Sequence, residues 1–509
     1  MAESSPASGP DFSSGISLSD CPQEGTIAGR VGDTAVLLSR IDGQFFAISA
    51  TCTHYGGALA EGFIGKNDVR CPLHHACFDL KTGIVLRAPA LDPLDRWRVE
   101  VEGDRLFVRE KLPALSHEAR PEGEVQRIVI IGGGAAGLAC AIELRKLGYD
   151  GSLTILSEDQ DAPYDRPNLS KDYLAGSALE EWMPLRSDDW YPMNNVELRL
   201  ETKVDALDIN KREVRLGSGE HIGFDRLLLA TGSEPRRLEQ DGFSGPNVFT
   251  LRSFADARAI IDFAKAGSKA AILGSSFIGL EAAAALRKRK IDVTIIAPEK
   301  TPFERILGSE LGQALRNLHE DHGVRFHLES SGARFQNGEV ILANGERIPA
   351  DFVLVGIGVT PRTKLAEDAG LTVDNGVWVD EHLETSCPGI FAAGDIAAYP
   401  DPLSKKRVRI EHWAVAERQG QVAAANMLGS QRRFDSAPFF WTEQHGVTVR
   451  YVGHAGRWDE VRSDGPIDTK DCLVRYYRQG KHLASATINR DRASLKDGLE
   501  LEAEMARTS

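Results

Sequence analysis

The chain has 509 residues, of which 42% are hydrophobic and 26% are charged, and its formal net charge is −14. This length exceeds what a single hydrophobic core usually serves, so about three or four domains are expected. The acidic balance argues against nucleic acid and against an anionic membrane as partners, because both attract basic surfaces.

Residues 1–19 contain neither the basic region nor the apolar core of a secretory signal, and no run of about 18 apolar residues occurs in the chain. We therefore predict a soluble, cytoplasmic protein. Seven cysteines in a chain of this length do not indicate a disulfide scaffold. The clustered pair Cys52 and Cys71 is better interpreted as metal-binding or redox-active.

Residues 26–112 predict a small all-β domain, because short β-like runs alternate with turns. Within it, Cys52-Thr-His54 is followed after 16 residues by Cys71-Pro-Leu-His74. Two thiolates and two imidazoles on two loops are the ligands of a Rieske [2Fe-2S] cluster, in which the cysteines hold one iron and the histidines the other. Zinc can use the same set and stays open as the alternative.

The loop residues around these ligands favour the cluster, and about residues 14–110 resemble the Rieske ferredoxins. High-potential Rieske proteins carry an extra cysteine in each loop, where this chain has Gly57 and Leu73. They also place hydroxyls against the cluster, where this chain has Ala76 and Phe78. The resemblance therefore implies a cluster without a loop disulfide and with a low reduction potential.

A polar segment with two prolines, residues 113–126, is predicted to be a linker. After it, apolar strands alternate with amphipathic helices, which is typical of βαβ units around parallel sheets. The sequence predicts a strand, a glycine-rich turn, a helix and a second strand in residues 127–158, and the same order again in residues 269–299. Two dinucleotide sites are predicted.

The first site has the fingerprint glycines Gly132, Gly134 and Gly137, with Glu158 expected at the end of the next strand. The glycines allow a tight turn beneath a pyrophosphate, and the carboxylate accepts the ribose hydroxyls.

The second site has the residues Gly274, Ser276 and Gly279 and is predicted to hold NAD(P)H. Its second strand leads into Ala297, with Glu299 and Lys300 soon after, instead of ending in an acid. We expect NADH, with NADPH as the alternative.

About residues 125–509 resemble the FAD-dependent pyridine-nucleotide oxidoreductases, on the segments 230–232 and 385–395. Residues 163–171 are similar to the subgroup of oxygenase-coupled ferredoxin reductases and apoptosis-inducing factors. The resemblance places FAD in the first site, and it implies flavin contacts from Arg166, Lys171, Thr231, Gly232, Asp395, His412, Trp413 and Trp441. Ordinary core packing is the alternative for the two tryptophans.

The redox cysteine pair of the disulfide reductases is missing here, since Arg166-Pro-Asn-Leu-Ser-Lys171 occupies that stretch. Electrons must therefore leave the flavin another way, and the attached cluster offers one. We predict that Lys171 and Glu281 form a catalytic ion pair beside the flavin, with a structural salt bridge as the alternative. His54 or His74 would receive the electrons.

The predicted fold is multidomain, with an all-β domain, two α/β Rossmann-like domains and a C-terminal α+β domain. The expected boundaries are 1–112 for the Rieske domain, 113–126 for the linker, 127–244 and 366–435 for the two parts of the FAD domain, 245–365 for the NAD(P)H domain and 436–509 for the C-terminal domain.

The whole architecture resembles the Rieske-containing branch of the apoptosis-inducing-factor-like proteins. It implies an NAD(P)H-dependent reductase that passes electrons through FAD and its own cluster to a one-electron acceptor such as an oxygenase component. A redox sensor that responds to NAD(P)H is the alternative function. We expect a monomer or a homodimer, and an acceptor protein as partner.

Overall fold

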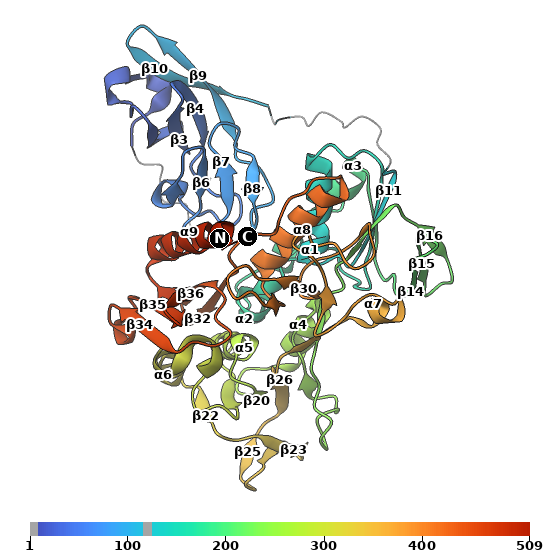
Figure 1. Cartoon of the computed structure of the whole chain (residues 1–509). Coiled ribbons are helices and arrows are strands. Elements are labelled where there is room, and N and C mark those ends of the chain that lie inside the picture. Colours follow the sequence, from blue (N-terminus) through green and yellow to red (C-terminus); the bar gives the residue numbers. More distant parts are fainter. Residues whose placement is uncertain (1–8, 114, 116–124, 509) are drawn as a thin grey trace.

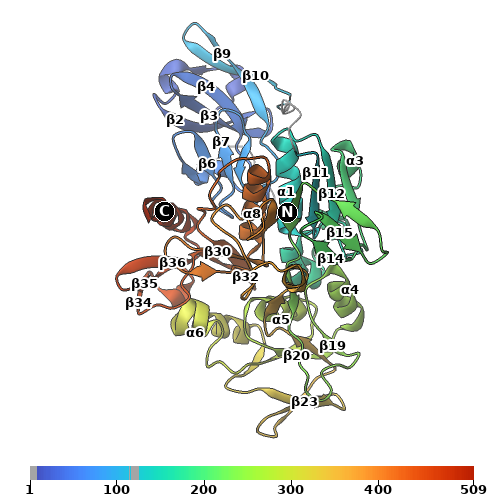
Figure 2. The same cartoon turned by 45° about the vertical axis from the view of Figure 1, so that its right-hand side comes forward.

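The computed structural model describes residues 9–113, 115 and 125–508. Most of the segment predicted to be a linker therefore lies outside the described residues. None of the helices in the described ranges combines the length and the apolar character of a membrane span. Figures 1 and 2 show the N-terminal domain resting on the two helices α8 and α9, above the two α/β domains.

The N-terminal domain consists of two antiparallel sheets. The first has the order β1-β10-β9-β4-β3-β2, and the second has the order β5-β6-β7-β8. The turn Asp42-Gly43 between β3 and β4 has φ of 50° and 81°, which suits a tight hairpin. The strands are β1 (Ile16–Ser17), β2 (Gly25–Val31), β3 (Thr34–Ile41), β4 (Gln44–Ser49), β5 (Phe63–Ile64), β6 (Asp68–Arg70), β7 (Cys77–Asp79), β8 (Val85–Arg87), β9 (Arg96–Glu102) and β10 (Arg105–Lys111).

The first α/β domain is built on a parallel sheet of order β13-β12-β11-β17-β29. Its central strands are almost entirely buried, as expected for a sheet that is covered on both faces. Its last strand comes from far along the chain, because the chain leaves this domain and returns to it. The elements are β11 (Arg127–Ile131), α1 (Ala135–Lys146), β12 (Ser152–Leu156), β13 (Val196–Arg199), β17 (Arg226–Leu229), β29 (Ile390–Ala392) and α8 (Trp413–Met427).

The second α/β domain repeats this plan with the order β19-β26-β20-β21-β22. Strands β18 (Ser233–Pro235) and β27 (Val359–Pro361) pair with each other as the chain passes between the two domains. The elements of the second domain are β19 (Val248–Phe249), α4 (Phe254–Phe263), β20 (Lys269–Leu273), α5 (Phe277–Lys288), β21 (Asp292–Ile296), α6 (Glu304–Asp321), β22 (Arg325–His327) and β26 (Phe352–Val355).

The C-terminal domain is an antiparallel sheet of order β32-β33-β36-β35-β34 with one long helix. Its elements are β32 (Phe439–Gln444), β33 (Val447–Gly453), β34 (Glu460–Asp464), β35 (Cys472–Arg478), β36 (Lys481–Ile488) and α9 (Asp491–Thr508). The fold class predicted from the sequence is thus confirmed: an all-β region, two parallel α/β sheets and a C-terminal α+β region.

Short elements complete the two α/β domains. Three small sheets lie on them, with the orders β14-β15-β16, β23-β24-β25 and β28-β30-β31. The remaining strands are β14 (Val204–Asp208), β15 (Glu213–Leu216), β16 (His221–Gly223), β23 (Gly332–Gln336), β24 (Glu339–Leu342), β25 (Arg347–Pro349), β28 (Val377–Trp378), β30 (Ala397–Pro400) and β31 (Arg407–Val408), and the short helices are α2 (Asp172–Ala175), α3 (Trp190–Met193) and α7 (Lys364–Asp368).

Candidate redox centres and the interface between them

The four predicted iron ligands lie together at one end of the N-terminal domain. Cys52 and His54 follow β4, whereas Cys71 and His74 lie in the loop between β6 and β7. The two thiols are 3% and 2% exposed and hydrogen-bond to each other, which raises the pKa of Cys52 and lowers that of Cys71. The Nδ1 atoms of His54 and His74 are 3.1 Å apart.

These donors fit a [2Fe-2S] cluster as two pairs. Two imidazole nitrogens bound to one tetrahedral metal at about 2.0–2.1 Å would lie roughly 3.3–3.4 Å apart, close to the separation observed. Burial lowers the pKa of His54 to about 3 and that of His74 well below its usual range. Both rings are therefore neutral at pH 7, which is the form that binds metal.

A single zinc ion would need all four donors to converge on one point. Within the described residues, no group of three or more Cys, His, Asp or Glu side chains is placed to hold one ion. A Rieske cluster requires only two protein ligands per iron, because sulfide supplies the rest. The geometry therefore favours the cluster over zinc.

The residues at which the ligand loops depart from the high-potential Rieske proteins are tightly packed. A Cβ atom on Gly57 would lie 2.7 Å from the Cys71 Sγ atom, so a cysteine does not fit there without a shift. Ala76 and Phe78 are fully buried. No hydroxyl from either position reaches the ligand loops, in keeping with the expectation of a low potential.

The purified protein is expected to contain two irons and labile sulfide per chain, together with one FAD. Elemental analysis of protein prepared anaerobically, combined with a sulfide assay, measures this. Zinc in place of iron, with no sulfide, would overturn the assignment of the Cys52, His54, Cys71 and His74 set.

The predicted FAD site is a long cavity along the carboxyl edge of the first parallel sheet. Its outer part has a volume of about 810 Å³ and continues into an inner part of about 190 Å³. Gly132 has φ +113°, and a Cβ there would lie 2.2 Å from the Ala230 carbonyl oxygen. A Cβ on Gly137 would lie 2.0 Å from the Gly132 carbonyl oxygen. Only glycine fits at these two positions, and the turn leaves the N-terminus of α1 open to the cavity.

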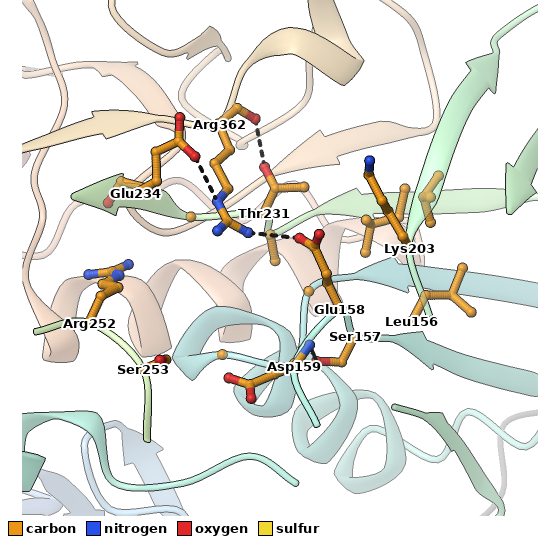
Figure 3. A pocket seen from close by; sticks show the side chains of 18 of the residues that line it. Leu156, Ser157, Glu158, Asp159, Lys203, Thr231, Glu234, Arg252, Ser253 and Arg362 are labelled. Carbon is orange, nitrogen blue, oxygen red and sulfur yellow. Dashed lines mark hydrogen bonds and ion pairs between the residues drawn. The ribbon is translucent and has the colours of Figure 1, made fainter. Parts of the chain in front are cut away.

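Glu158 lies two residues beyond the end of β12 instead of ending that strand, and it lines the outer cavity. Figure 3 shows its carboxylate directed toward Arg362, whose guanidinium is 3.1 Å away. Thr231 donates its hydroxyl to the Arg362 carbonyl oxygen and lies, like Gly232, on the same wall. The role of Glu158 toward a ribose stays a prediction.

Two charged side chains line the inner cavity, and one of them, Arg166, lies where the inner and outer cavities meet. Arg166 lines both parts, and its buried Nε atom has no hydrogen-bond partner in the protein. Asp395 accepts hydrogen bonds from Ser233 and Arg252 at 2.7 and 2.8 Å. Burial alone would raise the pKa of Asp395, but Arg252 and Ser233 lower it below its usual value. A buried guanidinium with an unpaired Nε–H group and a fixed carboxylate on a glycine-lined cavity fit a dinucleotide such as FAD.

The inner cavity also contains the predicted ion pair. The Lys171 Nζ atom is 2.8 Å from the Glu281 Oε2 atom, and their side chains are 17% and 6% exposed. Lys171 follows the short helical turn Arg166–Ser170, and Glu281 lies on α5 of the second α/β domain. The structure thus joins the two domains at this pair, whereas its catalytic role stays a prediction.

The three aromatic residues expected at the flavin lie in different places. Trp413 lines the inner cavity. His412 is the residue before α8, and its ring lies 4.3 Å from that of Phe440. Trp441 does not line either part of the cavity in the described structure; its ring instead lies 4.1 Å from the His74 ring and 6.0 Å from the His54 ring.

The predicted NAD(P)H site repeats the glycine turn of the FAD site. Gly274 has φ +109°, and a Cβ on Gly279 would lie 2.4 Å from the Gly274 carbonyl oxygen. Ser276 is the exposed N-cap residue of α5. A cavity of about 640 Å³ lies beyond β21 and β22 and contains Glu299 and Lys300.

Strand β32 separates the N-terminal domain from the inner cavity. Alternate side chains of a strand point to opposite faces. Thr442 donates its hydroxyl to the Glu281 Oε1 atom at 2.6 Å on one face, while Trp441 contacts the cluster histidines on the other. One strand thus contacts the predicted iron ligands on one face and, on the other, a side chain that lines the inner cavity.

Further contacts hold the N-terminal domain in place. Tyr55, which stacks on His54 at 4.1 Å, donates its hydroxyl to Asp165 of the first α/β domain. Arg450 donates to the Leu73 carbonyl oxygen at 2.9 Å. Other contacts reach α8 and α9: Gln421 with Ala88, Arg418 with Ala88 and His75, and Glu502 with Arg70 and Arg87.

Fold and site together define a flavin- and pyridine-nucleotide-dependent oxidoreductase that carries its own iron–sulfur domain. Residues 126–420 match the pyridine nucleotide-disulphide oxidoreductase family, residues 16–98 match the Rieske [2Fe-2S] domain, and residues 439–499 match the reductase C-terminal domain. The chain belongs to the pyridine nucleotide-disulphide oxidoreductase family. It is an NAD(P)H-dependent oxidoreductase of the ferredoxin reductase type, with FAD and a [2Fe-2S] cluster as cofactors.

Several known proteins are similar to this chain. Apoptosis-inducing factor 3 from Homo sapiens is 33% identical over 482 residues, which cover 91% of this chain and 79% of that protein. The ferredoxin–NAD(+) reductase component of the anthranilate 1,2-dioxygenase system from Burkholderia cepacia is 36% identical, over 71% of this chain and 90% of that protein. The covalent putidaredoxin reductase–putidaredoxin complex superposes with a TM-score of 0.73 at 32% identity, covering 75% of this chain and 94% of that one.

Proposed function

We propose that this chain passes electrons from NADH, by way of FAD, to the cluster of its own N-terminal domain, and from there to an acceptor protein. FAD supplies a group that accepts a hydride and releases electrons singly. The observation that carries the proposal is a pair of contacts made by β32. Trp441 on this strand packs against His74, one of the predicted iron ligands, and the next residue, Thr442, hydrogen-bonds to Glu281.

The protein's own residues prepare this transfer in three ways. The glycine turns at Gly132 and Gly274 are the expected binding sites of the two dinucleotides. Lys171 and Glu281 fix a charged wall where the two domains meet. Tyr55 and Arg450 tie the ligand loops to Asp165 of the first α/β domain and to β33 of the C-terminal domain.

Electron entry into the cluster is expected to be a first-order process within one chain. In rapid mixing with NADH, the rate of cluster reduction should stay the same when the protein concentration is raised tenfold. Replacing Trp441 by leucine should slow this step while flavin reduction keeps its rate, and both can be followed by their absorbance. A rate that rises in proportion to protein concentration would mean that electrons come from a partner chain.

NADH is preferred over NADPH in this proposal because the cavity beyond β21 is acidic. It is lined by Glu299, Glu304, Glu329 and Glu346, against Lys300, Arg305 and His327. A 2′-phosphate would meet repulsion from these carboxylates. We expect kcat/KM to be at least about 10-fold higher with NADH, since about 1.4 kcal/mol suffices for that factor. Equal values for the two nucleotides would refute this expectation.

A further inference from the structure

A chain of side-chain hydrogen bonds leads from Glu281 to His445, in the turn that follows β32. Thr442 Oγ1 donates to Glu281 Oε1 at 2.6 Å, and Gln444 Nε2 donates to Thr442 Oγ1 at 3.1 Å. The His319 Nε2 atom lies 2.9 Å from Gln444 Oε1, and the His445 Nε2 atom lies 3.3 Å from His319 Nδ1. The chain thus joins α5, β32, the end of α6 and the turn after β32.

The chain runs from the interior to the surface. Thr442, Gln444 and His319 are 0%, 1% and 0% exposed, whereas His445 is half-buried. The exposed His322 stacks on His445 with ring centroids 4.0 Å apart. Buried polar groups of this kind are costly unless each finds a partner, and here each of the three does.

The direction of every hydrogen bond follows from Glu281. An ionised carboxylate can only accept, so the Thr442 hydroxyl must donate to it. The Thr442 oxygen then accepts from the Gln444 amide nitrogen, which leaves the amide oxygen for the Nε2–H group of His319. His319 Nδ1 must accept from His445. One orientation of the whole chain therefore satisfies every group, and a reversed Gln444 amide would break two contacts.

We propose that Thr442, Gln444 and His319 form a positioning relay that holds the Glu281 carboxylate in the orientation in which it pairs with Lys171. The proposal rests on the proposed function, which places hydride transfer beside this pair. Lys171 and Ser170 bind the Oε2 atom of Glu281 at 2.8 and 2.5 Å, so Thr442 is the contact that fixes the other oxygen. Thr442 is itself fixed by Gln444 and His319.

The first test is independent of activity. In protein labelled with ¹⁵N-histidine, the His319 signals, identified by their loss in His319→Gln, should show Nε2 protonated and Nδ1 unprotonated at pH 7. The pKa of His319, lowered by burial to about 4, keeps the ring neutral there. An Nδ1–H tautomer or an imidazolium would contradict the orientation of the chain and overturn the proposal.

The second test uses matched variants of the holoenzyme. Thr442→Val removes the hydroxyl at nearly constant shape, and Thr442→Ser restores it. We expect the limiting rate of flavin reduction by NADH to fall about 10-fold in Thr442→Val and in Gln444→Met, with the Kd for NADH within twofold of wild type. Thr442→Ser should recover most of the rate. An unchanged limiting rate in both Thr442→Val and Gln444→Met would overturn the relay.

A control separates positioning from general stability. Asn426 lies near the end of α8 and makes three hydrogen bonds to backbone groups of residues 382 and 432. Asn426→Leu should lower the unfolding temperature without changing flavin reduction. The alternative is that the rate of flavin reduction falls in proportion to the unfolding temperature in every variant, Asn426→Leu included. In that case the network is structural only and the proposal fails.

A double variant shows whether the members act as a unit. The relay predicts that Thr442→Val/Gln444→Met is no slower than Thr442→Val alone, whereas independent contacts would give multiplied losses. Failure of the relay is distinguishable from failure of the proposed function. Glu281→Gln slows flavin reduction if the ion pair acts in hydride transfer, whether or not the relay residues matter.

Discussion

Replacing Cys71 by serine is expected to abolish the cluster and to reduce electron transfer to an acceptor protein at least about 100-fold, while hydride transfer to FAD stays close to wild type. The α/β domains have buried cores of their own, to which the N-terminal domain contributes only Leu91 among the described residues. Small artificial acceptors that reach the flavin directly should therefore still be reduced. Steady-state assays with both kinds of acceptor, and iron analysis, measure the result.

Cys77→Ser is the matched control for this experiment. Cys77 is also a buried cysteine of the N-terminal domain, but its Sγ atom contacts Asp68 at 3.1 Å and is not among the predicted ligands. The Cys77→Ser variant should retain the cluster and the activity with both kinds of acceptor. If Cys71→Ser loses both activities while remaining folded, electrons do not take the proposed order, and the sensor function becomes the better explanation.

Lys171→Met and Glu281→Gln are each expected to slow flavin reduction about 100-fold, and to slow both acceptor reactions equally, because both share the hydride step. A preorganised charged group at a reacting centre typically contributes a factor of about 10²–10³. Stopped-flow reduction with NADH gives the rate directly. Each single change leaves one buried partner without its counter-charge, so unfolding temperatures should fall as well.

The double variant Lys171→Met/Glu281→Gln tests the alternative of a structural salt bridge. It leaves no unpaired charge, so stability should largely recover while flavin reduction stays slow. The exposed pair of Lys496 and Glu500 on α9 provides a control, since such surface pairs contribute little. Recovery of the rate together with stability would show that the pair is structural.

The sequence predicted the architecture because its signals are local. A glycine at positive φ between a buried strand and a helix can be recognised without the rest of the fold, as at Gly132 and Gly274. The same holds for C-x-H and C-x-x-H ligand spacings. The Lys171–Glu281 pair was also predictable, although its two members lie in different domains.

The relay and the interface depend on tertiary contacts that no local pattern indicates. His319 on α6 and Gln444 on β32 are 125 residues apart and meet only in the folded protein. Tyr55 and Asp165 are 110 residues apart. A weak signal did exist for Gln444, because a fully polar side chain at an inward position of an apolar strand requires a buried partner.

Trp441 shows that a resemblance can single out a residue without indicating all of its neighbours. Its contact with the flavin stays a prediction, and in this chain its ring is packed against His74. The N-terminal domain therefore covers the face of β32 on which Trp441 lies.

Because the N-terminal domain covers the Trp441 face of β32, any separate electron carrier would have to compete with it for that face. An independent ferredoxin that sought the Trp441 face would have to displace a domain that belongs to the same chain. For tethered modules the effective local concentration is commonly about millimolar. A free carrier at micromolar concentration would occupy that face only rarely. On the proposed electron path, the fusion would therefore favour the chain's own cluster without any need for a tight intrinsic affinity between the two parts.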